Sequence, residues 1–209
     1  MKKLVLFFFV LLSFCCHAQD ISSVFGNMPK NLILLVDSIQ RHDLMNSYNK
    51  GNSSSDITDK LNGKISLVDF RKDFLELHSG NSSMQIALLK LVNDSKVICL
   101  IQTVCAPVCD SRLSFYTTEW KLLDASNFIS PVNASWFIKD DAPQADEVFM
   151  NAFKALDMDL IQYRFNPEKL ELTQTYTTPQ YLSKEDKEDI DPFLKQEPKV
   201  FVWEKWGFK

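Results

Sequence analysis

The sequence predicts an α+β protein with a largely antiparallel sheet and helices packed on it. Short apolar runs separated by turn residues fill the middle of the chain, as in strands joined by hairpins. Apolar residues at helical spacing precede these runs and return near residue 150. We expect one compact domain over 19–209. The order also allows two similar helix-plus-meander halves, 19–124 and 125–209, although no sequence repeat establishes a duplication.

The first eighteen residues have the pattern of a secretory signal peptide. Lys2 and Lys3 precede an apolar run over residues 4–14, which is too short to span a bilayer. A small residue, Ala18, then stands before the expected cut at Gln19. The sequence therefore predicts an exported protein of the periplasm or cell surface.

Lipoprotein anchoring is the alternative fate of this segment, because Cys15 or Cys16 could carry a lipid after cleavage. Lipid-modified cysteines generally follow a small residue. Here Phe14 precedes Cys15, and Cys15 itself precedes Cys16. Export in soluble form is therefore the favoured interpretation.

Composition sets limits on the class of protein. Hydrophobic residues make up 45% of the chain, which is enough for a substantial core. The formal net charge is −4 with no basic stretch, so a nucleic-acid partner is not expected. After the signal, no apolar stretch is long enough to predict a transmembrane segment.

The first long helix is predicted to begin near Pro29, because proline suits a first helical turn. It would extend through Tyr48 and end at Asn49-Lys50-Gly51, before a polar loop over 52–55. Its apolar face would consist of Leu32, Leu35, Val36 and Ile39.

The strongest strand signal is a hairpin of residues 84–92 and 97–104, whose two faces are both mostly apolar and should both be covered. A second helix is expected after Asp146, and Ser183 with Asp186 resembles the cap of a short third one. The other predicted strands are 65–70, 74–78, 113–122, 161–165, 170–176 and 200–206.

Three cysteines follow the signal. Cys105 and Cys109 flank Ala106-Pro107-Val108, where a proline turn can bring them together, so we predict a small disulfide loop with Cys99 left as a buried thiol. A redox pair usually has two intervening residues at a helix start, whereas this pair has three between strands. A structural bridge is therefore favoured over redox catalysis.

Several short motifs over residues 28–123 together carry a resemblance to a protein family. They are Met28-Pro29-Lys30-Asn31-Leu32, Arg41-His42-Asp43-Leu44-Met45, Leu61-Asn62-Gly63, Ile98-Cys99-Leu100-Ile101-Gln102-Thr103-Val104, Ala106-Pro107, Asp110-Ser111 and Phe115-Tyr116 through Trp120. With these motifs the chain resembles an uncharacterised exported protein family of Bacteroidales, a domain of unknown function. The resemblance implies a bacterial source and an exported location, and it transfers no catalytic residue.

The search for catalytic motifs gives mostly negative results. There is no Gly-rich phosphate loop, no Gly-x-Ser-x-Gly elbow and no His-Glu-x-x-His. His42 and His78, the histidines beyond the signal, are far apart in sequence. Asp110-Ser111 could form a hydrolytic dyad in principle, but a turn-capping Asp110 is favoured. We predict no catalytic residue, no metal site and no cofactor.

Aromatic residues provide the binding hypothesis. If Tyr116 and Trp120 lie on one strand, they face the same side about 13 Å apart, a span that suits an extended ligand. Trp203 and Trp206 add rings near the end of the chain. The competing interpretation, that these rings fill the space between sheet and helices, is favoured because large aromatics dominate protein interiors.

Taken together, these features favour a non-enzymatic binding or interaction module with an unknown protein, peptide or glycan partner. The alternative is an enzyme of unknown type, such as a hydrolase with residues assembled from distant segments. A pocket with a His–carboxylate or carboxylate pair would favour the enzyme. An open aromatic groove would favour the binding protein.

Overall fold

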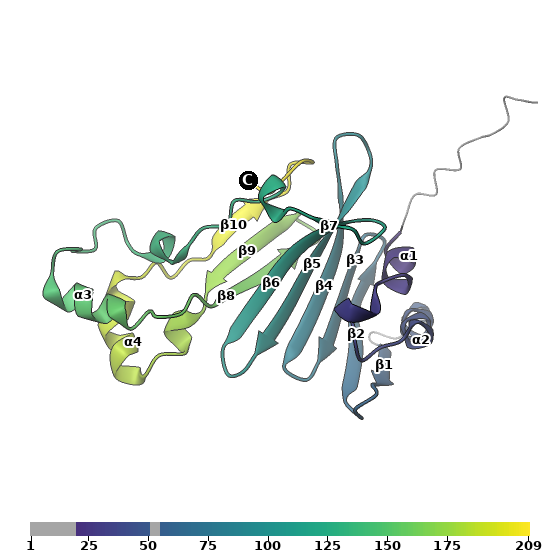
Figure 1. Cartoon of the computed structure of the whole chain (residues 1–209), viewed down its shortest axis with the longest axis horizontal. Coiled ribbons are helices and arrows are strands. Elements are labelled where there is room, and N and C mark those ends of the chain that lie inside the picture. The colour runs from purple at the N-terminus through teal and green to yellow at the C-terminus, as the bar shows by residue number, and fades with distance from the viewer. Residues whose placement is uncertain (1–19, 51–54) are drawn as a thin grey trace, which may run out of the picture.

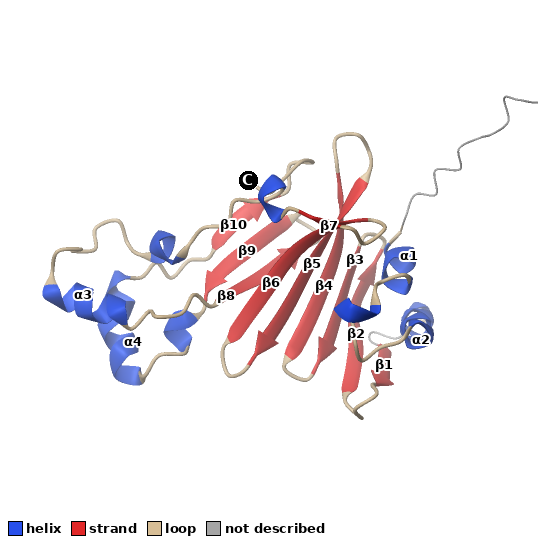
Figure 2. Cartoon of the chain, in the orientation of Figure 1, coloured by secondary structure: helices blue, strands red, loops and turns tan. Residues whose placement is uncertain are grey.

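A computed structural model describes residues 20–50 and 55–209. It contains a seven-stranded sheet in the order β1 to β7 and a three-stranded sheet in the order β10-β9-β8, and every pairing is antiparallel (Figure 1). The α+β prediction is confirmed (Figure 2). The predicted signal peptide and most of the predicted polar loop lie outside the described residues.

The elements follow one another in nearly the predicted order. The strands are β1 Ser55–Thr58, β2 Lys64–Arg71, β3 Phe74–Ser79, β4 Ser82–Lys90, β5 Lys96–Cys105, β6 Cys109–Thr117, β7 Leu122–Leu123, β8 Ile161–Asn166, β9 Glu171–Tyr176 and β10 Lys199–Val202. The α-helices are α1 Ile21–Gly26, α2 Ser38–Asn49, α3 Glu147–Lys154 and α4 Lys184–Ile190. In the described part of the chain, no helix has the length and apolar character needed to cross a membrane.

The β4–β5 hairpin forms the centre of the large sheet, and both of its faces are buried as predicted. Ile86 and Leu100 pair across the strands and point into one core, whereas Ala87 and Cys99 pair one residue further on and point into another. Side chains alternate between the faces of a strand, so an uninterrupted apolar run requires cover on both sides.

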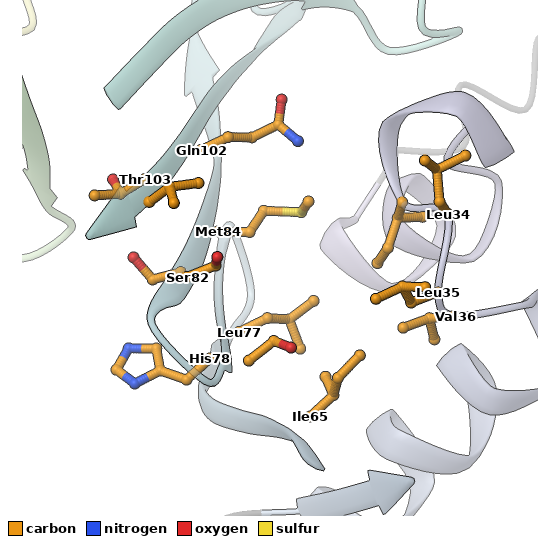
Figure 3. Close-up of a pocket in the computed structure, with 14 residues that line it drawn as sticks. Leu34, Leu35, Val36, Ile65, Leu77, His78, Ser82, Met84, Gln102 and Thr103 are labelled. Atoms are coloured by element: carbon orange, nitrogen blue, oxygen red, sulfur yellow. The ribbon is translucent and has the colours of Figure 1, made fainter. Parts of the chain in front are cut away.

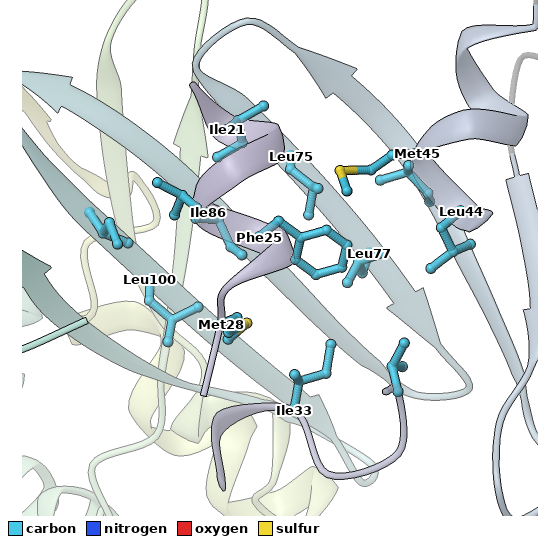
Figure 4. Close-up of a cluster of buried hydrophobic side chains, with 14 of the residues drawn as sticks. Ile21, Phe25, Met28, Ile33, Leu44, Met45, Leu75, Leu77, Ile86 and Leu100 are labelled. Carbon is cyan, nitrogen blue, oxygen red and sulfur yellow. The ribbon is translucent and has the colours of Figure 1, made fainter. Parts of the chain in front are cut away.

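The first core lies between the large sheet and the N-terminal segment with α1 and α2. Phe25 of α1 is fully buried, and Figure 4 shows its ring among Leu75, Leu77 and Ile86. Burying a side chain of this size stabilises the fold by about 2–3 kcal/mol. The sequence prediction missed α1, although Asp20 caps it by accepting the Ser23 N–H.

The second core lies between the other face of the large sheet and the three-stranded sheet. Phe115 of β6, Leu172 of β9 and Phe201 of β10 are buried together in it. Strand β8 places its outer edge against the large sheet. The β8 N–H groups at this edge donate to side chains of the large sheet: Ile161 to Asp110, Tyr163 to Ser111 and Phe165 to Gln85.

The long helix α2 begins at Ser38, so the predicted start near Pro29 is wrong. Asp37 accepts the Gln40 N–H, and the Gln40 side chain accepts the Asp37 N–H, which forms a capping box at this point. Residues 29–36 instead form a connector with one 3₁₀ turn, Lys30–Leu32. The apolar residues of this connector mimic a helical pattern while following the surface of the sheet.

Two predicted strands end earlier than expected. Strand β6 stops at Thr117 because the chain turns back through Trp120, which has a φ of 63° and donates its N–H to the Thr117 carbonyl. Strand β10 stops at Val202, after which Trp203 pairs with Phe208 across a tight turn.

Candidate binding groove beside the first core

An apolar groove lies between the connector and the far ends of β3, β4 and β5. Its volume is about 270 Å³. Figure 3 shows Leu34, Leu35 and Val36 on one side, facing Ile65, Leu77 and Met84 on the other. The groove continues the first core outward, since Val36, Ile65 and Leu77 also belong to that core.

Two side-chain hydrogen bonds hold the first half of the connector in place. Gln102 of β5 donates to the Leu32 carbonyl at 3.2 Å. Arg41 of α2 is buried and donates to the Met28 carbonyl at 2.6 Å, so two of the family-like motifs meet here. Burial lowers the pKa of the Arg41 guanidinium, while Asp37 acts in the opposite direction.

The mouth of the groove exposes aliphatic side chains. Leu34 is 74% exposed and Val104 is 56% exposed, and both line the groove. His78 borders the groove, but Figure 3 shows its ring on the side of the sheet away from the connector. Among the described residues, the groove therefore presents mainly aliphatic contact surface, and its titratable side chain, His78, points away from it.

Tyr116 and Trp120 belong to the first core, so they do not form the predicted surface pair. They are 6% and 9% exposed, and their ring centroids are 5.4 Å apart. The expected spacing of about 13 Å is wrong because Trp120 lies in the turn after β6. The Trp120 indole N–H donates to the Val24 carbonyl at 2.9 Å, which satisfies its polar atom inside the core.

Trp203 and Trp206 differ in exposure. Trp203 is 6% exposed, belongs to the second core and donates its indole N–H to the Lys90 carbonyl. Trp206 is 53% exposed, with the Lys209 ammonium 4.0 Å from its ring centre. The four predicted rings therefore do not gather on one surface, and Trp206 alone among them is open to a partner.

The cysteines take the places expected for a bridged loop and a buried thiol. Cys105 and Cys109 are opposite each other at the end of the β5–β6 hairpin, and their Sγ atoms are placed as a disulfide. Cys99 is buried in the second core, and burial raises the pKa of its thiol far above the ordinary value.

A His–carboxylate pair lies on the opposite face of the sheet from the groove. The buried Glu76 carboxylate contacts the His78 Nε2 at 2.9 Å and accepts a hydrogen bond from Gln85 at 3.0 Å. Arg164 of β8 is 3.7 Å away. Both Glu76 oxygens thus have partners at the junction with β8, so the pair contributes to the contact between the sheets.

Asp110 and Ser111 also act at this junction, which corrects the turn-capping interpretation. Asp110 accepts the Ile161 N–H at 3.1 Å, and Ser111 accepts the Tyr163 N–H at 3.0 Å while bonding the Thr103 hydroxyl. Within residues 20–50 and 55–209, no three His, Cys, Asp or Glu side chains gather as a metal site.

Sequence reasoning missed the groove, although one signal was present. Residues 32–36 are five consecutive apolar residues, more than one helix face can bury, and they stand directly before the Asp37 cap. Such a run before a cap indicates an extended apolar connector with part of its surface exposed.

The fold is that of a two-sheet α+β protein with an apolar groove beside the first core. The chain belongs to a family described as "Protein of unknown function (DUF3256)", whose model matches residues 13–208. It is similar to the structure of a domain of an uncharacterized protein from Porphyromonas gingivalis W83, with 25% identity and a TM-score of 0.80. The match covers 89% of this chain and 96% of that chain. No curated protein matches.

Proposed function

We propose that this protein is an exported, non-enzymatic interaction module that holds an apolar peptide segment of a partner protein in the groove. The observation that carries the proposal is the exposed aliphatic surface of Leu34 and Val104 at the mouth of an apolar cavity. Apolar side chains at a preformed groove mark a site for protein contact.

Among protein, peptide and glycan partners, the groove favours a peptide. Its exposed lining is mainly aliphatic, with serine, threonine and glutamine side chains at the strand ends, whereas Tyr116, Trp120 and Trp203, which could have stacked on a sugar, are buried in the two cores. The volume of about 270 Å³ suits a few aliphatic side chains of an extended segment. The interaction would therefore be driven by apolar burial.

The place of action in this proposal is the periplasm or the cell surface. The basic and apolar start of the chain supports cleavage between Ala18 and Gln19 and release in soluble form. Intact-mass measurement of the exported protein should give a chain that begins at Gln19. A mass that includes a diacylated or triacylated Cys15 or Cys16 would establish membrane anchoring instead.

Charge placed at the mouth of the groove tests the binding function. The variant Leu34→Asp/Val104→Asp should lose binding to peptides selected from an array of extended nonapeptides, while keeping its thermal stability, because both positions are exposed. The matched control is Val92→Asp/Leu122→Asp, at aliphatic positions that are 74% and 66% exposed outside the groove. Equal binding by both variants would refute the site.

The Glu76–His78 pair supports the second candidate, a hydrolase. In that case Glu76→Gln and His78→Asn should each abolish turnover of a chromogenic ester or peptide substrate by the purified protein. The interaction-module proposal expects no turnover above buffer by the unaltered protein. Turnover that depends on both residues would replace it.

A further inference from the structure

A second cavity, of about 160 Å³, lies between β9 and the chain segment that contains α4. Helix α4 stands at the opposite end of the molecule from α2 and the groove (Figure 1). The stacked rings of Phe137 and Tyr176, with centroids 5.3 Å apart, form part of its wall. Leu194 adds a buried aliphatic side chain. The cavity therefore combines an apolar wall with the polar residues of α4.

Two opposite charges line this cavity without pairing. Lys187 lies in the last turn of α4 and Asp191 directly follows the helix, four residues further on, and both are half-buried. In the described part of the chain, neither side chain makes an ion pair or a hydrogen bond. At the same spacing on the same helix, Lys184 and Glu188 do pair, at 3.7 Å. Lys195 and Glu197 line the cavity as well, but the Lys195 ammonium pairs with Asp140 at 2.9 Å and Glu197 is exposed. Among the described residues of the lining, Lys187 and Asp191 are therefore the half-buried ammonium and carboxylate without a partner that a ligand can engage.

The size of the cavity limits the ligand. A protein cavity of about 150 Å³ accommodates benzene, which has six non-hydrogen atoms. L-Alanine also has six non-hydrogen atoms and carries an ammonium and a carboxylate group. A ligand with both charges satisfies Lys187 and Asp191 together, whereas an anion or cation alone leaves one of them half-buried and unpaired.

We propose that this cavity binds a free amino acid with a small side chain. Lys187 contacts the α-carboxylate, Asp191 contacts the α-ammonium, and the side chain packs on the Phe137–Tyr176 wall. The site is separate from the apolar groove, so its occupancy and peptide binding at the groove are tested independently.

Titration of the ¹⁵N-labelled mature chain with L-alanine tests the proposal, with backbone amide shifts as the readout. L-Alanine should shift the amides around Thr175 and Gln180, which line the cavity. N-Acetyl-L-alanine lacks the ammonium and L-alaninamide lacks the carboxylate, so each should bind at least about tenfold more weakly. L-Tryptophan should not bind, because its ring system exceeds the volume.

Variants of α4 assign the charges. Lys187→Gln should weaken the binding of L-alanine about tenfold or more, yet leave the weak binding of L-alaninamide, which has no carboxylate, unchanged. Asp191→Asn should weaken the binding of L-alanine to the same extent. It should leave the weak binding of N-acetyl-L-alanine, which has no ammonium, unchanged. Lys184→Gln and Glu188→Gln are the matched controls and should leave L-alanine affinity unchanged. The absence of cavity shifts with L-alanine, binding of either analogue as tight as that of L-alanine, or equal losses in the controls would overturn the proposal.

Discussion

The side-chain amide of Gln85 in β4 bonds the main chain of Phe165 in β8 from both ends. Its Oε1 accepts the Phe165 N–H at 2.9 Å, and its Nε2 lies 3.4 Å from the Phe165 carbonyl. The amide thus bonds the backbone groups at the outer edge of β8 that a neighbouring strand would otherwise bond. Because unpaired strand edges invite association, this contact closes the small sheet against the large one.

Replacing Gln85 with leucine should destabilise the protein by about 3 kcal/mol, because the buried Phe165 N–H and a Glu76 oxygen lose their partner. Gln162→Leu in β8 is the control, since the Gln162 side chain makes no hydrogen bond within the described residues. It should change stability by less than about 0.5 kcal/mol. Urea unfolding measures both, and equal losses would show that Gln85 does not secure the junction.

Trp120 and Trp206 should respond in opposite ways to truncation. Trp120→Ala removes a buried ring and the hydrogen bond to Val24, so it should cost about 3–5 kcal/mol. Trp206→Ala removes a half-exposed ring and its contact with Lys209, and it should cost less than about 1 kcal/mol. Thermal unfolding distinguishes them. A Trp120→Ala variant with unchanged stability would place this ring outside the core.

Thiol labelling should find one reactive cysteine in the mature protein, and only after denaturation. Cys99 is buried, and Cys105 with Cys109 should be oxidised in the exported protein. Alkylation followed by peptide mass analysis, with and without reductant, identifies the labelled positions. Native protein that labels at both Cys105 and Cys109 without reductant would rule out the bridge.

Cys99 should make the protein less stable at alkaline pH. Burial raises the pKa of its thiol in the folded state, so the folded protein keeps a proton that the unfolded chain releases above about pH 8.5. The contribution of Cys99 to the free energy of unfolding is complete below that pH and should fall by about 1.4 kcal/mol per pH unit above it. Urea unfolding between about pH 8 and pH 10 measures the slope. Cys99→Ala should remove this component, and an unchanged slope would contradict the assignment.

The hairpin of β4 and β5 could be predicted because its side chains alternate between two cores. Each of its strands is therefore apolar at consecutive positions, a pattern that can be read directly from the sequence. The start of α2 could not be placed by apolar spacing, since Leu32, Leu35 and Val36 satisfy helical periodicity while forming a connector. Asp37 and Gln40, three residues apart, contained the better signal.

The junction between the sheets lay beyond sequence reasoning because its partners are distant in the chain. Gln85 and Phe165 are 80 residues apart, and Ser111 and Tyr163 are 52 apart. The groove was hidden for a related reason: Leu34 faces Leu77 and Met84 across it only because the connector lies along the sheet. The predicted ring pair failed because a single turn at Trp120 ended the strand.

The interaction-module proposal depends on whether a partner occupies the groove in the living cell. Site-specific photo-crosslinking from position 34 measures this directly, with position 92 as the equally exposed control. We predict one discrete adduct from position 34 that maps to an apolar peptide of a single partner, and none from position 92. No adduct from position 34, or the same adducts from both positions, would contradict the proposed function.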